Sequence, residues 1–299
     1  MNGFRAMSVV LAVCVVSVVS AQPMPAVSNT LMLHLDAGSL NGTLLDGAPV
    51  TAWDGGGVCG TFTVPYGDNF PDRNITNPTA PTWIADGLNG MPVVRFSHED
   101  GRKDVLRAAG LDFQNNYRGE QEWTFFFVLA NVDSMRGLID TAPCSEDCIR
   151  VLTESGTSAL LSNQRNDAGG VSLAAVQTAS FSADGGVVFS FTVNGDGGTR
   201  NWETFINGES DLVHSEGSVQ RGVIWQYPQI GVINRGDANE HFAWFQGDIA
   251  EIIAFEGVLS ETDRKAVETY LYAKYIDVPE PATMSLLALG GLTLLRRRR

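Results

Sequence analysis

The sequence predicts an all-β protein: a two-sheet antiparallel jelly-roll sandwich, with one helix near its C-terminal end that packs against it. Three observations lead to this prediction. Short apolar or alternating runs recur along the chain, separated by Gly, Asn, Asp and Pro. Little helical periodicity lies between them, which disfavours a doubly wound sheet. The one clear helical pattern follows the last apolar run.

Strands are expected where apolar residues alternate with polar ones or run continuously. The expected ranges are Leu31–Leu35, Val93–Phe96, Glu122–Ala130, Gly137–Asp140, Ile149–Thr153, Ala159–Ser162, Val187–Val193, Trp202–Ile206, Leu212–His214, Gln229–Ile233 and Ala243–Phe255. The segment from Trp123 is nearly continuous in apolar residues, as in a strand covered on both faces. Asn207 and Gly208 favour a two-residue hairpin turn, because both positions accept positive φ.

The C-terminal helix is expected to begin after Ser260, because Ser260–Asp263 supplies an N-cap and an acidic first turn. Its apolar residues recur at helical spacing: Val267, Tyr270, Leu271 and Tyr275. We expect this stripe to pack against the sandwich.

Residues 1–21 have the layout of a secretory signal peptide. Arg5 gives a positive start, an apolar stretch follows from Ser8 to Ser20, and small residues precede Gln22. The apolar stretch is too short to cross a hydrocarbon core of about 30 Å. We therefore expect cleavage before Gln22, followed by a short linker over residues 22–29.

The C-terminal end carries a second targeting signal over residues 277–299. Pro279-Glu280-Pro281 leads into a 13-residue apolar run, Thr283–Leu295, which ends in four arginines: Arg296, Arg297, Arg298 and Arg299. Such a positive cluster is retained on the cytoplasmic side of a membrane. This layout resembles the PEP-CTERM sorting signal of Gram-negative bacteria. The resemblance implies an exosortase-type membrane protease as partner and export to the cell surface or extracellular matrix; the alternative is a plain tail anchor.

The charge balance excludes one class of partner. Without residues 1–21 and 279–299, the body of 257 residues has 15 basic and 33 acidic side chains, a net charge of −18. Phosphate backbones are bound by clustered cations, so nucleic acid is not an expected partner.

The cysteines of the body are consistent with export to an oxidising compartment. Cys144 and Cys148 are spaced to close a small disulfide loop, which leaves Cys59 free or paired with one of them. A metal or redox site is disfavoured, since no His or second Cys pair lies nearby.

The body resembles LamG-like, concanavalin A-like domains of bacterial secreted proteins. Its closing strand and helix carry the resemblance through Gly247–Phe255, Leu259-Ser260 and Val267–Tyr275. Its opening carries it through Leu33–Ala37, Val50–Asp54 and Gly87–Phe96. The resemblance implies one two-sheet jelly roll over residues 30–276. It says less about activity, because one fold hosts many functions.

Enzyme chemistry has little support in the sequence, and we assign no catalytic residue. A retaining glycosidase needs two carboxyl groups about 5–5.5 Å apart. The nearest candidates, Asp248 and Glu251, are three residues apart and would lie on opposite faces of a regular strand. The four His are scattered and match neither a Gly-x-Ser-x-Gly elbow nor a metal-binding spacing.

Calcium is the cofactor that we consider, because hard cations take several oxygen ligands. Two loops are rich in such oxygens, and proteins that resemble this fold often hold calcium at loop ends. The candidate ligands are Asn194, Asp196, Asp237, Asn239 and Glu240.

Extracellular polysaccharide is the other candidate ligand, because aromatic rings stack on sugar faces beside polar side chains. Residues near turns lead this set: Trp53, Asp54, Trp225 and Tyr227. We therefore expect a secreted, non-enzymatic binding or structural protein associated with glycan. The alternatives are a polysaccharide-active glycosidase or lyase on the same fold and a structural surface protein without a ligand.

If the C-terminal signal is recognised as expected, replacing Pro279-Glu280-Pro281 with alanines should trap uncleaved protein in the membrane, because the protease loses its recognition motif. Fractionation and immunoblotting of the producing cells measure this. Unchanged processing of the variant would refute the prediction.

Overall fold

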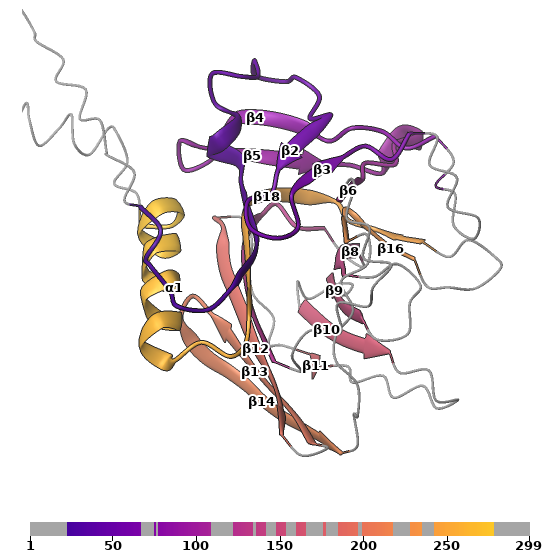
Figure 1. Cartoon of the computed structure of the whole chain (residues 1–299). Helices are drawn as coiled ribbons and strands as arrows, with labels where there is room; N and C mark the ends of the chain where they lie inside the picture. The colour runs from indigo at the N-terminus through magenta and orange to yellow at the C-terminus, as the bar shows by residue number, and fades with distance from the viewer. Residues whose placement is uncertain are drawn as a thin grey trace, which may run out of the picture.

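The computed structural model describes residues 23–66, 75, 77–108, 122–133, 136–141, 148–153, 160–165, 176–177, 185–196, 199–217, 228–234 and 242–277. Within these ranges the strands form two antiparallel eight-stranded sheets and a small two-stranded one (Figure 1). A single α-helix, α1 (Glu261–Tyr275), follows the last strand in the described part of the chain. The expected all-β sandwich with one C-terminal helix is confirmed.

The first sheet is built around the long strand β18. In spatial order its strands are β14 (Glu209–Gly217), β13 (Thr199–Ile206), β12 (Val187–Asp196), β7 (Trp123–Ala130), β18 (Gly247–Glu256), β5 (Met91–Phe96) and β4 (Thr82–Leu88). β1 (Leu31–Asp36) pairs with β18 on the same edge as β5. The first strand of the domain and the last are therefore direct neighbours.

The second sheet consists mainly of short strands. In spatial order they are β11 (Val176–Gln177), β10 (Leu160–Arg165), β9 (Cys148–Thr153), β8 (Arg136–Asp140), β15 (Gln229–Ile230), β6 (Leu106–Ala108), β3 (Thr61–Thr63) and β2 (Ala52–Asp54). The remaining elements are the hairpin β16 (Val232–Asn234) and β17 (Phe242–Trp244) and the 3₁₀ turns η1 (Ala37–Leu40) and η2 (Glu99–Gly101).

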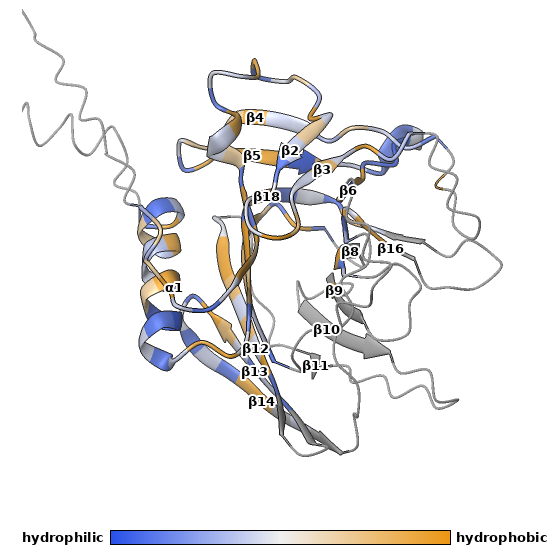
Figure 2. Ribbon diagram, in the orientation of Figure 1, coloured by the Kyte–Doolittle hydropathy of each residue, from blue (hydrophilic) through white to orange (hydrophobic). Residues whose placement is uncertain are grey.

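Strand β7 is buried along its whole length, as its apolar sequence predicts. Phe125 and Phe127 point into the core between the sheets, where the Phe191 ring of β12 stacks on them. Phe126 and Val128 point to the other face and belong to a second apolar cluster with helix residues. The first sheet is thus the middle layer of three, with the second sheet on one face and α1 on the other (Figures 1 and 2).

Helix α1 begins and packs as expected. The Ser260 hydroxyl accepts a hydrogen bond from the backbone N–H of Asp263, which satisfies one of the free donors of the first turn. Val267, Leu271 and Tyr275 are fully buried against the first sheet. The stripe is therefore a packing surface of the domain.

The hairpin turn is also confirmed, since Asn207 and Gly208 have φ of 52° and 85° between β13 and β14. Two expected strands are each divided in the structure. The range Gln229–Ile233 is broken at Gly231, which has a φ of 91° and leads the chain from β15 into β16. The range Ala243–Phe255 is divided between β17 and β18, which belong to different sheets. Apolar continuity hides such breaks, because it marks burial and not hydrogen-bond partners.

The segment that precedes β1 runs beside α1 (Figure 1). Met24 and Val27 pack against the apolar cluster under the helix. The expected signal peptide and the apolar run Thr283–Leu295 lie outside the described residues. Among the residues that are described, no helix is long and apolar enough to cross a membrane.

The helix contact can be measured by truncation of one buried side chain. Leu271→Ala should lower the free energy of unfolding by about 2–5 kcal/mol, because it leaves a cavity against the first sheet. Tyr272→Ala, next to it but 39% exposed, is the matched control and should change stability far less. Urea unfolding followed by circular dichroism compares the two. Equal losses would contradict the described packing.

Candidate functional site

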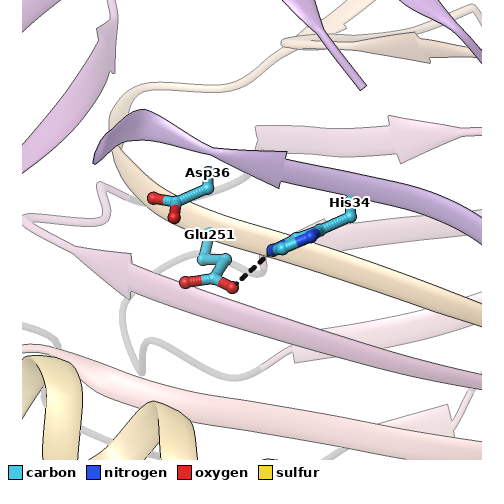
Figure 3. Close-up of side chains that lie close together, drawn as sticks. All are labelled: His34, Asp36 and Glu251. Atoms are coloured by element: carbon cyan, nitrogen blue, oxygen red, sulfur yellow. Dashed lines mark hydrogen bonds and ion pairs between the residues drawn. The ribbon is translucent and has the colours of Figure 1, made fainter. Parts of the chain in front are cut away.

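Three side chains that can bind protons or metal ions converge where β1 meets β18 (Figure 3). His34 and Asp36 are two residues apart in β1 and so share one face of the strand. Asp36 stands opposite Glu251 in the antiparallel register. Nε2 of His34 lies 2.7 Å from Oε1 of Glu251, and ligand atoms of all three lie within 4.8 Å of one another. We call these residues the β1–β18 cluster.

A β-bulge at Ala250 decides which way Glu251 points. β18 pairs with β5 over its first three residues and with β1 from Glu251 onward, and its register with β7 skips Ala250 between these parts. Ile249 and Ile252 both belong to the core between the sheets. Glu251 therefore points to the outer face, where it contacts α1.

The bulge also corrects the expectation for the carboxyl pair. Asp248 precedes the core residue Ile249 and faces outward, where Arg95 binds it through hydrogen bonds of 2.7 and 2.8 Å. Asn131 donates a third bond, of 2.7 Å. Asp248 and Glu251 therefore lie on the same face, and the expectation of opposite faces is wrong because it assumed a regular strand.

Helix α1 completes the cluster with its last turns. The Lys274 ammonium donates to Oδ2 of Asp36 and to Oε2 of Glu251, both at 2.7 Å. The Tyr275 hydroxyl lies 2.8 Å from Oε2 of Glu251 and 3.2 Å from Oδ1 of Asp36. The Tyr270 hydroxyl lies 3.1 Å from the Lys274 nitrogen and 3.4 Å from Oε1 of Glu251. Four side chains thus surround one carboxylate.

Burial makes these contacts electrostatically strong. The Glu251 side chain is fully buried, and that of Lys274 is 9% exposed. Burial alone would lower the pKa of Lys274, but the carboxylates of Glu251 and Asp36 outweigh it and raise this pKa above its ordinary value. Burial and the charge of Glu251 raise the pKa of Tyr270 to about 12 and that of Tyr275 well above its ordinary value. Both tyrosines therefore remain protonated hydrogen-bond donors at neutral pH.

The cluster is better suited to holding an ammonium group than a metal ion. One imidazole and two carboxylates are suitable ligands for a transition metal. The Lys274 nitrogen, however, lies at hydrogen-bond distance from both carboxylates and already supplies the neutralising charge. A cation would have to displace this side chain from beneath α1. The chemistry available here is proton transfer among Lys274, Glu251 and Asp36.

The sequence contained partial signals for this site. The run from Leu33 to Asp36 alternates apolar and polar residues, which indicates that His34 and Asp36 share a face. Lys274 follows Tyr270 at helical spacing. Neither pattern says that the two surfaces meet, so the sequence by itself does not bring these residues together in one site.

The glycan candidates are only partly described. The Trp53 ring is fully buried, and its indole N–H donates to the Asp36 carbonyl at 3.1 Å, so this ring is not available to a sugar. Asp54, the next residue in β2, is exposed on the outer face of the second sheet. Trp225 and Tyr227 lie outside the described residues.

The calcium candidates are divided in the same way. Asn194 and Asp196 lie at the end of β12. The buried Oδ1 of Asn194 has no hydrogen-bond partner among the described residues, as would suit a cation ligand. Asp237, Asn239 and Glu240 lie outside the described residues.

Of the cysteines, Cys59 is free and buried, and burial raises the pKa of its thiol. Of the two expected alternatives for Cys59, the structure therefore has the free thiol. Cys148 begins β9, whereas Cys144 lies outside the described residues. Their expected pairing stays a prediction.

The second sheet carries a row of buried polar side chains on its outer face. Arg107, Gln229 and Asp140 stand opposite one another on β6, β15 and β8. The Arg107 guanidinium donates to the Gln229 side-chain oxygen at 2.9 Å. Their strand neighbours face the core between the sheets: Leu106, Ile139 and Ile230. Alternation therefore directs this polar row away from the core.

Comparison with known proteins identifies the C-terminal segment. Residues 277–299 match the PEP-CTERM protein-sorting motif. This motif indicates an exported protein with a C-terminal sorting signal, recognised in sorting by an exosortase. No curated protein matches the chain in sequence.

Two solved structures with a TM-score above 0.5 support the β-sandwich fold, and a third similar structure lies just below that value. An arabinofuranosidase in complex with arabinofuranosyl-alpha-1,2-xylobiose has a TM-score of 0.53 at 12% identity, over 86% of this chain and 61% of that protein. A GH54 a-l-arabinofuranosidase soaked with a cyclic sulfate inhibitor also has a TM-score of 0.53 at 12% identity, over 84% and 60%. Domain 4 of AbnA, an extracellular arabinanase of Geobacillus stearothermophilus in complex with arabinotriose, has 0.49 at 14%, over 80% and 98%. None of the three is described as LamG-like.

The calcium hypothesis predicts a change in thermal stability. If Asn194 and Asp196 help to hold calcium, EDTA should lower the melting temperature by roughly 5–10 °C, the shift expected from losing a saturating ligand. Asp196→Ala should lose this EDTA effect. Asp86→Ala, which changes an exposed aspartate of β4, should retain it. A calorimetric scan that EDTA leaves unchanged would rule out a stabilising calcium ion.

Proposed function

We propose that this protein is a non-enzymatic component of the bacterial cell surface or extracellular matrix that associates with polysaccharide. The observation that carries the proposal is the sorting motif at residues 277–299, joined directly to a β-sandwich. The motif supports delivery outside the cell. The similar arabinofuranosidase structure holds an arabinose-containing oligosaccharide on a chain of related fold.

The outer face of the second sheet is the surface that we assign to glycan. Asp54 is exposed at its edge, whereas the polar row of Arg107, Gln229 and Asp140 is buried and helps to order this face. An exposed carboxylate such as that of Asp54 can accept hydrogen bonds from the hydroxyl groups of a sugar. Tyr66 follows β3 of the same sheet, and 62% of its surface is exposed, so its ring is open to stacking.

A non-enzymatic role is supported by the contacts of the two carboxylates that come nearest to a glycosidase pair, Asp248 and Glu251. A glycosidase needs one carboxyl group to protonate the leaving oxygen and a second to attack or to activate water. Asp248 is held by Arg95 and Asn131, and Glu251 is held beneath α1. Both are committed to contacts within the protein and lie away from the second sheet.

Two alternatives have their own supporting observations. The similarity to two arabinofuranosidases favours a polysaccharide-active enzyme. The burial of four tryptophans favours a structural protein without a ligand; they are Trp53, Trp83, Trp123 and Trp202. Sugar-cleaving activity in the test below would support the first alternative, and a lack of any retention would support the second.

Polysaccharide pull-down of residues 22–278, with and without calcium, tests the proposal. Retention on the native exopolysaccharide is expected, and Tyr66→Ala should weaken it by roughly fivefold, because aromatic contacts contribute on the order of 1 kcal/mol each. Tyr272→Ala removes a partly exposed tyrosine from α1, on the opposite side of the molecule, and should bind normally. Absence of retention on every matrix, or equal loss in both variants, would refute the assigned surface.

A further inference from the structure

Lys274 and Asp36 come from opposite ends of the domain and meet at bonding distance. The Lys274 nitrogen lies 2.7 Å from Oδ2 of Asp36, although 238 residues separate them in sequence. Glu251 contacts the same nitrogen at 2.7 Å through Oε2. We propose that Lys274 and Asp36 become joined by an intramolecular isopeptide bond, with Glu251 carrying the proton between them.

The arrangement contains each group that amide formation requires. Lys274 supplies the nitrogen nucleophile and Asp36 the carbonyl carbon. Glu251 is a fully buried carboxylate in contact with the nucleophile, where it can accept a proton and return it. His34 and Tyr275 hold the two oxygens of Glu251 at 2.7 and 2.8 Å and so fix its position.

Two donors are aimed at the oxygen that would become negative in the tetrahedral intermediate. Oδ1 of Asp36 accepts a hydrogen bond of 2.7 Å from the backbone N–H of Gly38. The Tyr275 hydroxyl lies 3.2 Å from the same oxygen, and its single proton, which is donated to Glu251 before the reaction, can turn to this oxygen once Glu251 has taken a proton from Lys274. Such a pair stabilises charge as it develops during attack on a carboxyl carbon. Oδ2, which faces Lys274, is then the oxygen that leaves.

The reaction is balanced without any further reactant. The ammonium of Lys274 and the carboxylate of Asp36 together hold three protons and no net charge. Glu251 takes one proton from the nitrogen, the freed amine attacks Cγ, and a bond forms between Nζ and Cγ. The bond from Cγ to Oδ2 then breaks, and Oδ2 departs as water with two of the three protons. One proton remains on the amide nitrogen, and Glu251 is again a carboxylate.

Burial of the reacting groups determines whether amide formation can occur and how fast it is. Removal from water reduces the advantage of the ion pair over the neutral amine and acid. The same two carboxylates raise the pKa of Lys274, so the amine forms only when a proton passes to Glu251. We therefore expect a single slow closure after folding, in contrast to a repeated reaction.

The bond would be a covalent cross-link within this exported domain. It would tie the first strand, β1, to the last turn of α1, directly before the sorting segment at 277–299. A link that closes so long a loop restricts the unfolded chain strongly, as a long-range disulfide does. Cys59 is free, so it does not supply such a link.

Mass spectrometry of the denatured full chain provides the decisive test. The wild-type protein should be about 18 Da lighter than its processed sequence, the mass of one water. A protease digest should contain a branched peptide that joins the Asp36 and Lys274 segments. Wild-type protein with the full sequence mass and no branched peptide would overturn the proposal and leave only an ion pair.

Single substitutions test which side chains form the bond. Glu251→Gln keeps the shape of the side chain but removes the proton carrier, and Lys274→Met removes the nucleophile; both should have the full mass. The matched control is Lys265→Met, because Lys265 forms an exposed pair of 2.6 Å with Glu261 on the same helix. It should still lose one water. Loss of water in Lys274→Met would contradict the assignment, and the wild-type mass decides the case if a variant fails to fold.

Discussion

A fully buried carboxylate on the central strand of the first sheet governs how the two ends of the domain meet. Glu251 has no exposed surface, and an isolated charge in such a position is costly. His34, Lys274, Tyr270 and Tyr275 offset this cost by surrounding it with donors. Because they come from β1 and α1, satisfying one carboxylate brings the first strand and the last helix against the same face of the sheet.

The first sheet can serve as a middle layer because its long strands are apolar on both faces. Phe125 and Phe127 fill the space between the sheets, whereas Phe126 packs toward α1. The second sheet differs, since the face turned away from the core carries the buried polar row of Arg107, Gln229 and Asp140. The first sheet thus packs through apolar side chains on both faces, whereas the second sheet joins the core with one face and carries hydrogen-bonded polar side chains on the other.

Export from the cell bears on both the charge of the body and the contact of Lys274. The body is strongly acidic, with a net charge of −18 once the terminal segments are set aside, which favours solubility over association with other anionic polymers. Lysine is scarce on such a chain, yet Lys274 is held beneath the helix between two carboxylates. An exported protein loses the protection of the cytoplasm, and a tight junction between its chain ends resists opening from either terminus.

Local patterns predicted much of the fold. The turn at Asn207-Gly208, the helix that begins after Ser260 and the doubly buried strand from Trp123 all follow from residues close together in sequence. The sorting motif is likewise a linear pattern and could be recognised without any fold. These features depend on intrinsic backbone preferences, on capping and on hydrophobic periodicity, so neighbouring residues suffice to specify them.

The cluster around Glu251 could not be predicted in this way, because it depends on which strands pair. A bulge at Ala250 arises where β18 exchanges β5 for β1 as its partner, and it turns Glu251 toward α1. The turn-like surroundings of Trp53 similarly favour a ring that is open to sugar, but packing between the sheets buries this ring. Sequence alone specified the targeting signals, the hydrophobic periodicities and the turns. Only the tertiary structure, through the long-range register of β18, placed Asp36, Glu251 and Lys274 within reach of one another, because no local rule encodes a contact across 238 residues.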